Sequence, residues 1–405
     1  MNNSKLIGSI LMITGTMIGA GMLALSIVSA KAGFAVATVT LITMWAVMTI
    51  TALLTLEVNL AFEEYSNSLG NMAFKILGIH GRTASWFCTL ILLYSLTAAY
   101  ISGNSSLITN IIELAFHIKT PNWLNATIYL LAMGWVVFWS TKCVDYCNRI
   151  LMILKICLLW VTFTLMLPTV NIANITNNSY DNRCLLSMLP VFLCSFGFHT
   201  IIPSLSNYIG RKPRELKLAI ICGSSTALII YLLWLFATMG MIPWSGTHSF
   251  TSIMQPNGHI LVRDFVKNIY ETVDNKWMTV GINGFSNIAM TTSFLGVTLG
   301  LFDFLADGFK YSNNRSGRFK TSLLTFIPPL VFALFFPNGF LLALKFAALF
   351  ATIITIILPT LMAYKLRCNT KLSSPYRVFG GNYLLCIMMT IGIIMLVVIL
   401  FSLFI

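Results

Sequence analysis

The chain has 405 residues, of which 57% are apolar and 9% are charged. Water-soluble domains carry about 25% charged residues, so most of this chain cannot form a surface in contact with water. The composition excludes a soluble protein and predicts an integral membrane protein. The chain also has a formal net charge of +13.

A membrane-spanning helix needs about 20 mainly apolar residues. The sequence predicts eleven such spans, starting near Leu6, Phe34, Ala84, Asn122, Ile150, Leu185, Leu218, Asn283, Thr321, Phe340 and Asn382. Because eleven is odd, the two termini are expected on opposite sides of the membrane. We expect an all-α fold with a single transmembrane domain over residues 1–405.

The positive charge is concentrated in alternate connections between these spans. Seventeen Lys and Arg residues lie in one set of connections and six in the other, while Lys155 and Lys345 fall inside spans. By the positive-inside rule the N-terminus is cytoplasmic and the C-terminus external. The basic excess therefore indicates topology and a lipid bilayer as partner. It does not indicate nucleic-acid binding.

Two longer connections carry apolar residues at helical spacing. The cytoplasmic stretch 57–82 predicts a short helix on the membrane face, and the outer stretch 242–280 predicts a helical lid over the entrance. The first span resembles a signal peptide at residues 28–30, but it is long, glycine-rich and followed by ten further spans. The nine cysteines are scattered without metal-ligand spacing, so we expect free thiols, no metal and no cofactor.

Two spans are interrupted near their centres. Span one contains the glycine-rich string from Thr14 to Gly21, and span six contains Ser195-Phe196-Gly197-Phe198-His199, followed by Pro203. Irregular backbone at bilayer depth is tolerated where it lines a cavity. Paired interruptions at corresponding positions of two halves are typical of transporter binding sites. We therefore expect an inverted 5+5 repeat, residues 6–170 and 185–366, with an extra helix at 382–405.

Four strings resemble the hydroxy and aromatic amino acid permease family: residues 15–24, 94–103, 195–199 and 292–303. The similarity extends over the whole chain and includes Phe326-Ile327-Pro328-Pro329-Leu330; the sequence departs from the family pattern at Ser26, where a proline is expected. The resemblance implies the LeuT-like inverted-repeat fold of the amino acid–polyamine–organocation superfamily. It also implies proton-coupled uptake of an aromatic amino acid, L-tyrosine above all, across the bacterial inner membrane, with the C-terminus periplasmic.

An amino acid substrate brings a carboxylate and an ammonium group, both of which need partners at mid-bilayer. Unwinding of span one frees backbone amides at the positive end of the following half-helix, which suits a carboxylate. Freed carbonyls in both interruptions suit the ammonium group. The expected substrate contacts are Thr16, Gly19, Ala20 and Gly21 for the carboxylate and Ile18, Ser195 and Phe196 for the ammonium. The alternative is that Gly15 and Gly19, like Gly296 and Gly300, form GxxxG packing faces.

An aromatic substrate also needs an apolar slot. Phe198 lies in the second interruption, and Tyr94 and Tyr100 lie in span three, which the fold places beside the site. Each ring can instead face lipid or the protein core. His199 can bind a phenolic hydroxyl or carry a proton, or it can be a neutral histidine bonded to the backbone.

Lys155 lies about six residues inside span five, roughly 9 Å along the helix. It can extend to the cytoplasmic surface, or it can be buried, where desolvation favours loss of its proton. The superfamily resemblance implies the buried alternative, with proton coupling through Lys155, Thr292, Ser293 and the carbonyls of Gly15 and Ile18. Glu57, Asp303 and Asp307 are interpreted as gating or anchoring charges.

Other function classes are less compatible with the sequence. A membrane enzyme would need a nucleophile or metal motif, and the sequence has no HExxH, Walker A or G-x-S-x-G string. A channel would more naturally show a repeated selectivity filter. Within the transporter class, tryptophan or a broad range of aromatic amino acids remains the alternative to tyrosine.

Overall fold

The computed structural model describes residues 3–62, 68–176, 184–254, 260–273, 275–312, 314–369 and 374–403. These residues form helices and one isolated β-bridge between Met254 and Ile260. Within them, nine helical segments are long and apolar enough to cross a membrane, and the bent pair α1 (Asn3–Met17) and α2 (Ala20–Ser29) makes a tenth. The prediction of an all-helical membrane protein is confirmed.

The fourth expected span corresponds to α5 (Asn122–Trp139), which has 18 residues but is less apolar than the ten segments. The count of eleven spans and the inverted repeat therefore stay predictions. The remaining helices of the first half are α3 (Phe34–Leu60), α4 (Leu69–Phe116), α6 (Thr141–Met166), η1 (Leu167–Thr169) and α7 (Ile172–Thr176). Those of the second half are α8 (Cys184–Ser195), η2 (His199–Ile201), α9 (Ile202–Ile209), α10 (Pro213–Met241), α11 (Val262–Val273), α12 (Lys276–Phe309), α13 (Arg315–Phe335), α14 (Phe340–Thr352), the π-helical segment η3 (Ile353–Ile357), α15 (Leu358–Cys368) and α16 (Gly381–Ser402).

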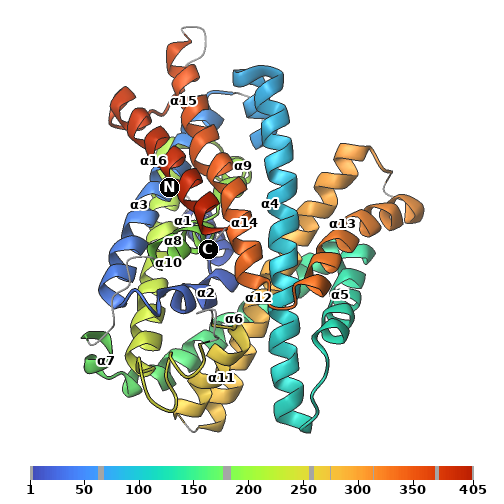
Figure 1. The fold of residues 1–405 in the computed structure, drawn as a ribbon. Helices are drawn as coiled ribbons and strands as arrows, with labels where there is room; N and C mark the ends of the chain where they lie inside the picture. Colours follow the sequence, from blue (N-terminus) through green and yellow to red (C-terminus); the bar gives the residue numbers. More distant parts are fainter. Residues whose placement is uncertain are drawn as a thin grey trace.

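Helix α4 runs along most of the height of the molecule and separates two groups of helices (Figure 1). On one side α5 and α13 pack against it. On the other lie α1, α2, α3, α8 and α10, and α12 packs against both α4 and α6. The two interrupted spans thus lie inside the larger group, surrounded by α3, α10, α12 and α14.

The predicted short cytoplasmic helix is the first part of α4. Ser68 caps it by accepting a hydrogen bond from the Asn71 amide, and Met72 and Ala73 are fully buried. The helical path breaks at Gly78, whose φ of 73° and ψ of −156° lie where a side chain would be strained. Glycine at this position therefore lets the short helix turn into the long span.

The segment predicted to form a lid contains helix α11, which packs against α2, α4 and α12. Its apolar face is buried, with Phe265 and Ile269 at 0% exposure, and the ring of Phe250 stacks on Phe265 at 6.5 Å between centroids. Whether this helix covers an entrance stays a prediction.

Glu57 of α3 and Arg367 of α15 form a buried two-pronged ion pair with both N···O distances at 2.7 Å. Glu57 also accepts the Val378 amide at 2.8 Å, and Arg367 donates to the Gly381 carbonyl at 2.7 Å. This ion pair joins α3, α15 and the start of α16. The observation agrees with an anchoring role for Glu57.

Candidate functional site

The first interruption lies between α1 and α2, whose axes differ by 51°. Ile18 and Gly19 leave the helix here: the Ile18 amide still donates to the Thr14 carbonyl at 3.0 Å, and the Met22 amide donates to the Gly19 carbonyl at 3.1 Å. The negative end of α1 and the positive end of α2 therefore meet at mid-span. The amides of the first turn of α2, at Ala20 and Gly21, have no acceptor within the helix.

Lys155 of α6 lies at this interruption. Its side chain is buried, and its ammonium Nζ donates to the Ile18 carbonyl at 2.7 Å and to Thr292 Oγ1 of α12 at 3.4 Å. A positive charge at the C-terminal end of α1 complements the helix dipole. The position matches the buried alternative for Lys155 and two of its expected neighbours; the role of the group in proton coupling stays a prediction.

Gly19 and Gly21 allow neighbouring helices to approach the interruption closely. A Cβ atom on Gly19 would overlap Ser293 Oγ of α12, and a Cβ on Gly21 would lie 2.6 Å from Ser195 Oγ of α8. Both glycines therefore lie where the first interruption meets two other spans. Any larger residue would force the serine side chain to move, or would fill the space beside the unpaired amides of α2.

The two GxxxG pairs differ in the space around their glycines. A Cβ on Gly15 would lie 2.6 Å from Met152 Cε of α6, so Gly15 does permit close packing. By contrast, a Cβ on Gly296 or Gly300 would meet no atom within 4 Å, because this side of α12 faces away from the chain. The expected packing face at Gly296 and Gly300 is therefore wrong within this chain.

The second interruption begins where α8 ends at Ser195. Phe196 and Phe198 are fully buried. The ring of Phe196 contacts the ring of Tyr231 edge to face, with 5.3 Å between the centroids. Pro203 lies in the first turn of α9, where a missing amide does no harm. The backbone between the two half-helices is thus held among aromatic side chains.

Tyr231 of α10 is the main residue that sequence reasoning missed. Its buried hydroxyl lies 2.5 Å from the Met17 carbonyl of α1 and 2.9 Å from the Ser195 carbonyl of α8. One phenol therefore contacts the last helical residue before each interruption. A tyrosine in the middle of an apolar span needs a buried hydrogen-bond partner, so the presence of Tyr231 in this span is itself a sequence signal for a buried polar contact.

The carbonyls expected to bind a substrate ammonium already accept hydrogen bonds. Ile18 accepts from Lys155, Ser195 accepts from Tyr231, and Phe196 accepts from the Phe198 amide at 3.1 Å. A carbonyl oxygen has two lone pairs. An ammonium group at this position would use the second lone pair or displace one of these donors.

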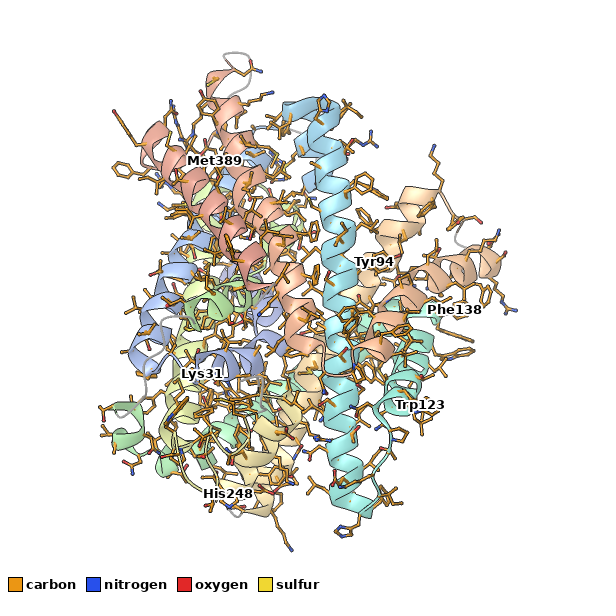
Figure 2. All side chains as sticks on the ribbon, viewed as in Figure 1. Lys31, Tyr94, Trp123, Phe138, His248 and Met389 are labelled. Atoms are coloured by element: carbon orange, nitrogen blue, oxygen red, sulfur yellow. The ribbon has the colours of Figure 1, made fainter. Side chains whose placement is uncertain are left out.

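The two expected tyrosines of α4 occupy different environments. Tyr100 is buried and lies within interaction distance of Ser293, next to Gly19, and of Tyr231. Tyr94 is six residues away, about 120° around the helix, and donates to the Leu324 carbonyl of α13 at 2.7 Å. Figure 2 shows Tyr94 on α4. The structure joins Tyr100 to the interruptions and places Tyr94 against α13 instead.

Two further residues expected to bind substrate contact other parts of the chain instead. His199 is buried, with Nε2 2.9 Å from Thr51 Oγ1 of α3 and no partner at Nδ1 among the described residues. Thr16 is exposed, and its hydroxyl donates to the Met12 carbonyl of its own helix at 2.7 Å. In the part of the chain that the structure describes, no group of three or more His, Cys, Asp or Glu side chains is placed to hold a metal ion.

Comparison with known proteins gives a consistent result over the whole length. Residues 2–399 match the tryptophan/tyrosine permease family. The tyrosine-specific transport systems 1 and 2 of Haemophilus influenzae are each 36% identical to this chain, covering 96% and 98% of it and 95% and 97% of their own lengths. A tryptophan-specific transport protein of Shigella flexneri is also 36% identical, over 96% of this chain and 93% of its own. The chain therefore belongs to the tryptophan/tyrosine permease family.

Proposed function

We propose that this protein imports an aromatic amino acid, with L-tyrosine as the first candidate, across the bacterial inner membrane by proton symport. The names of two relatives at 36% identity support tyrosine. Tryptophan is the second candidate, because a relative named for tryptophan is equally identical. In this proposal the N-terminus is cytoplasmic and the C-terminus periplasmic, as the distribution of Lys and Arg indicates.

The contact that supports proton coupling is the hydrogen bond between Lys155 Nζ and the Ile18 carbonyl. The charged ammonium stabilises the C-terminal end of α1 and holds α6 and α12 beside it. When the proton leaves, the charge–dipole attraction is lost and the contact weakens. The bend between α1 and α2 can then change, so that binding of a proton and opening of the site are coupled.

Transport into proteoliposomes tests both parts of the proposal. Radiolabelled tyrosine, tryptophan and phenylalanine are supplied outside, with and without an imposed inward proton gradient. We expect accumulation of tyrosine above the outside concentration only with the gradient. Equilibration without accumulation under both conditions would favour a channel-like protein, and preferential accumulation of tryptophan would favour the second candidate.

A further inference from the structure

A cavity of about 460 Å³ lies outside the interruptions. It is formed by the last turns of α4, the connection to α5 and the first turns of α11, at the end of the molecule where α11 and the C-terminal end of α4 lie (Figure 1). By the charge distribution this is the external side. The cavity is here called the outer cleft.

The outer cleft carries charges of both signs. Its basic residues are Lys119, Arg263 and Lys267, and its acidic residues are Glu113 and Asp264. Arg263 lies 3.2 Å from Asp264, and Lys267 pairs at 3.7 Å with Glu271 outside the cleft. Glu113 and Lys119 form no ion pair with any residue in the described ranges. Among the described residues, the cleft therefore presents one carboxylate and one ammonium group that have no ion-pair partner within 4 Å.

The floor of the outer cleft is polar and fixed. Thr109 and Asn110 are buried; Thr109 donates to Asn122 Oδ1 at 2.8 Å, and Asn110 donates to Asn283 Oδ1 of α12 at 3.3 Å. Beside Asn110 and Glu113 lies Tyr270, whose buried hydroxyl makes no hydrogen bond of normal geometry with a described residue. Its burial, with Glu271 and Glu113 nearby, raises the pKa of Tyr270 to about 12, so the hydroxyl remains a donor.

The outer cleft is separate from the interruptions. Asn110 is ten residues from Tyr100 on α4, about 15 Å along the helix, and Asn283 is nine residues from Thr292 on α12, about 14 Å. A single amino acid is too short to contact both places. Both helices nevertheless extend from one place to the other: Asn110 of α4 lines the cleft, and Asn283 of α12 accepts its hydrogen bond.

We propose that the outer cleft is a second binding site that takes the ammonium and carboxylate groups common to all α-amino acids. Glu113 binds the ammonium, and Lys119 with Arg263 binds the carboxylate. The side chain of the bound amino acid points out of the cleft, so the outer cleft recognises an amino acid without selecting an aromatic ring. The proposal rests on the proposed function in one respect: it assumes that the protein transports amino acids.

Glu113→Gln and Lys119→Gln in proteoliposomes test this role. We expect the apparent KM for tyrosine uptake to rise about fivefold in each variant, the effect of losing one partly exposed charge interaction, with the maximal rate unchanged. Glu113→Asp keeps the charge and should keep the wild-type KM. Lys276→Gln is the matched control, because Lys276 is exposed at the start of α12 and does not line the outer cleft.

L-alanine, which has no ring, provides a second readout. Excess alanine should raise the KM for tyrosine in the wild-type protein and in Glu113→Asp, and should have no effect in Glu113→Gln. Wild-type KM values in both glutamine variants, or equal competition by alanine in Glu113→Gln, would overturn the proposal.

Failure of the proposed function would give a different pattern. If the wild-type protein accumulates no aromatic amino acid, the outer cleft is tested by direct binding of radiolabelled alanine to the purified protein. Saturable binding that is lost in Glu113→Gln and kept in Glu113→Asp supports the cleft independently of transport. Absence of saturable binding, or equal binding in both variants, rejects it.

Discussion

Replacing Lys155 by glutamine removes a buried positive charge from the interruption of span one while keeping a side chain that can donate a hydrogen bond. Lys155 is 2% exposed, and its ammonium lies 2.7 Å from the Ile18 carbonyl. A glutamine amide can occupy part of this space but cannot release or take up a proton at any accessible pH. We expect the variant to bind and exchange substrate but not to use a proton gradient.

The expected magnitudes follow from the contact. Hydrogen bonds to charged groups contribute about 1.5–3 kcal/mol and neutral ones about 0.5–1.5 kcal/mol, so the variant loses about 1–2 kcal/mol at this position. The effect on coupling is larger. Each unit of pH difference is worth about 1.4 kcal/mol per proton, or a factor of about ten in concentration. With one proton per substrate and no membrane potential, two pH units support up to about 100-fold accumulation in the wild-type protein and none in Lys155→Gln.

The assay is uptake of radiolabelled tyrosine into proteoliposomes whose membrane potential is clamped at zero by valinomycin and equal potassium on both sides. Exchange of internal for external tyrosine is measured in the same preparations. Lys345→Gln is the matched control, because Lys345 is also a buried lysine within a span and donates to the Ser402 carbonyl at 2.8 Å, at the end of α16. We expect this control to accumulate tyrosine as the wild-type protein does.

Two results would refute the reasoning. If Lys155→Gln accumulates tyrosine in response to the gradient, Lys155 is only a structural contact, and Glu57, His199 or Asp303 must be tested as the proton carrier. If Lys345→Gln loses accumulation as well, the effect follows from removing any buried lysine and not from the contact with Ile18.

Three further predictions address the site and the topology. Gly19→Val should abolish the increase in melting temperature that tyrosine produces, because the side chain overlaps Ser293, whereas Gly296→Val, with no atom within 4 Å of its Cβ, should keep it; a normal shift in Gly19→Val would assign the glycine to packing alone. Tyr231→Phe removes the one hydroxyl proton that the Met17 and Ser195 carbonyls share, so we expect a loss of about 1–3 kcal/mol in stability, seen as a lower melting temperature without ligand, and an unchanged value would show that the bridge contributes nothing. In a protein otherwise free of cysteine, a membrane-impermeant thiol reagent added to intact cells should label Lys276→Cys and not Lys212→Cys; the reverse pattern contradicts the proposed orientation.

Local sequence determined the features that depend on a window of about 20 residues. Span composition predicted the membrane setting, and the glycine string predicted the interruption at Ile18 and Gly19, where the helix bends by 51°. The end of α8 at Ser195 was predictable for the same reason, since Gly197 and Pro203 disfavour a continuous helix. A lysine inside an apolar span was itself a signal, because its burial requires a partner.

Tertiary structure decided which way each side chain points. The partner of Lys155 is 137 positions away, and the carbonyls that Tyr231 joins belong to two other helices; no local pattern specifies these contacts. Tyr94 and Tyr100 belong to one predicted span, but packing turns Tyr94 toward α13. The GxxxG spacing of Gly296 and Gly300 predicts a packing face, but that side of α12 faces outward. Hydropathy fixes that a segment enters the membrane, but the rotation of a helix about its axis depends on the close packing of all its neighbours, which is a property of the assembled bundle.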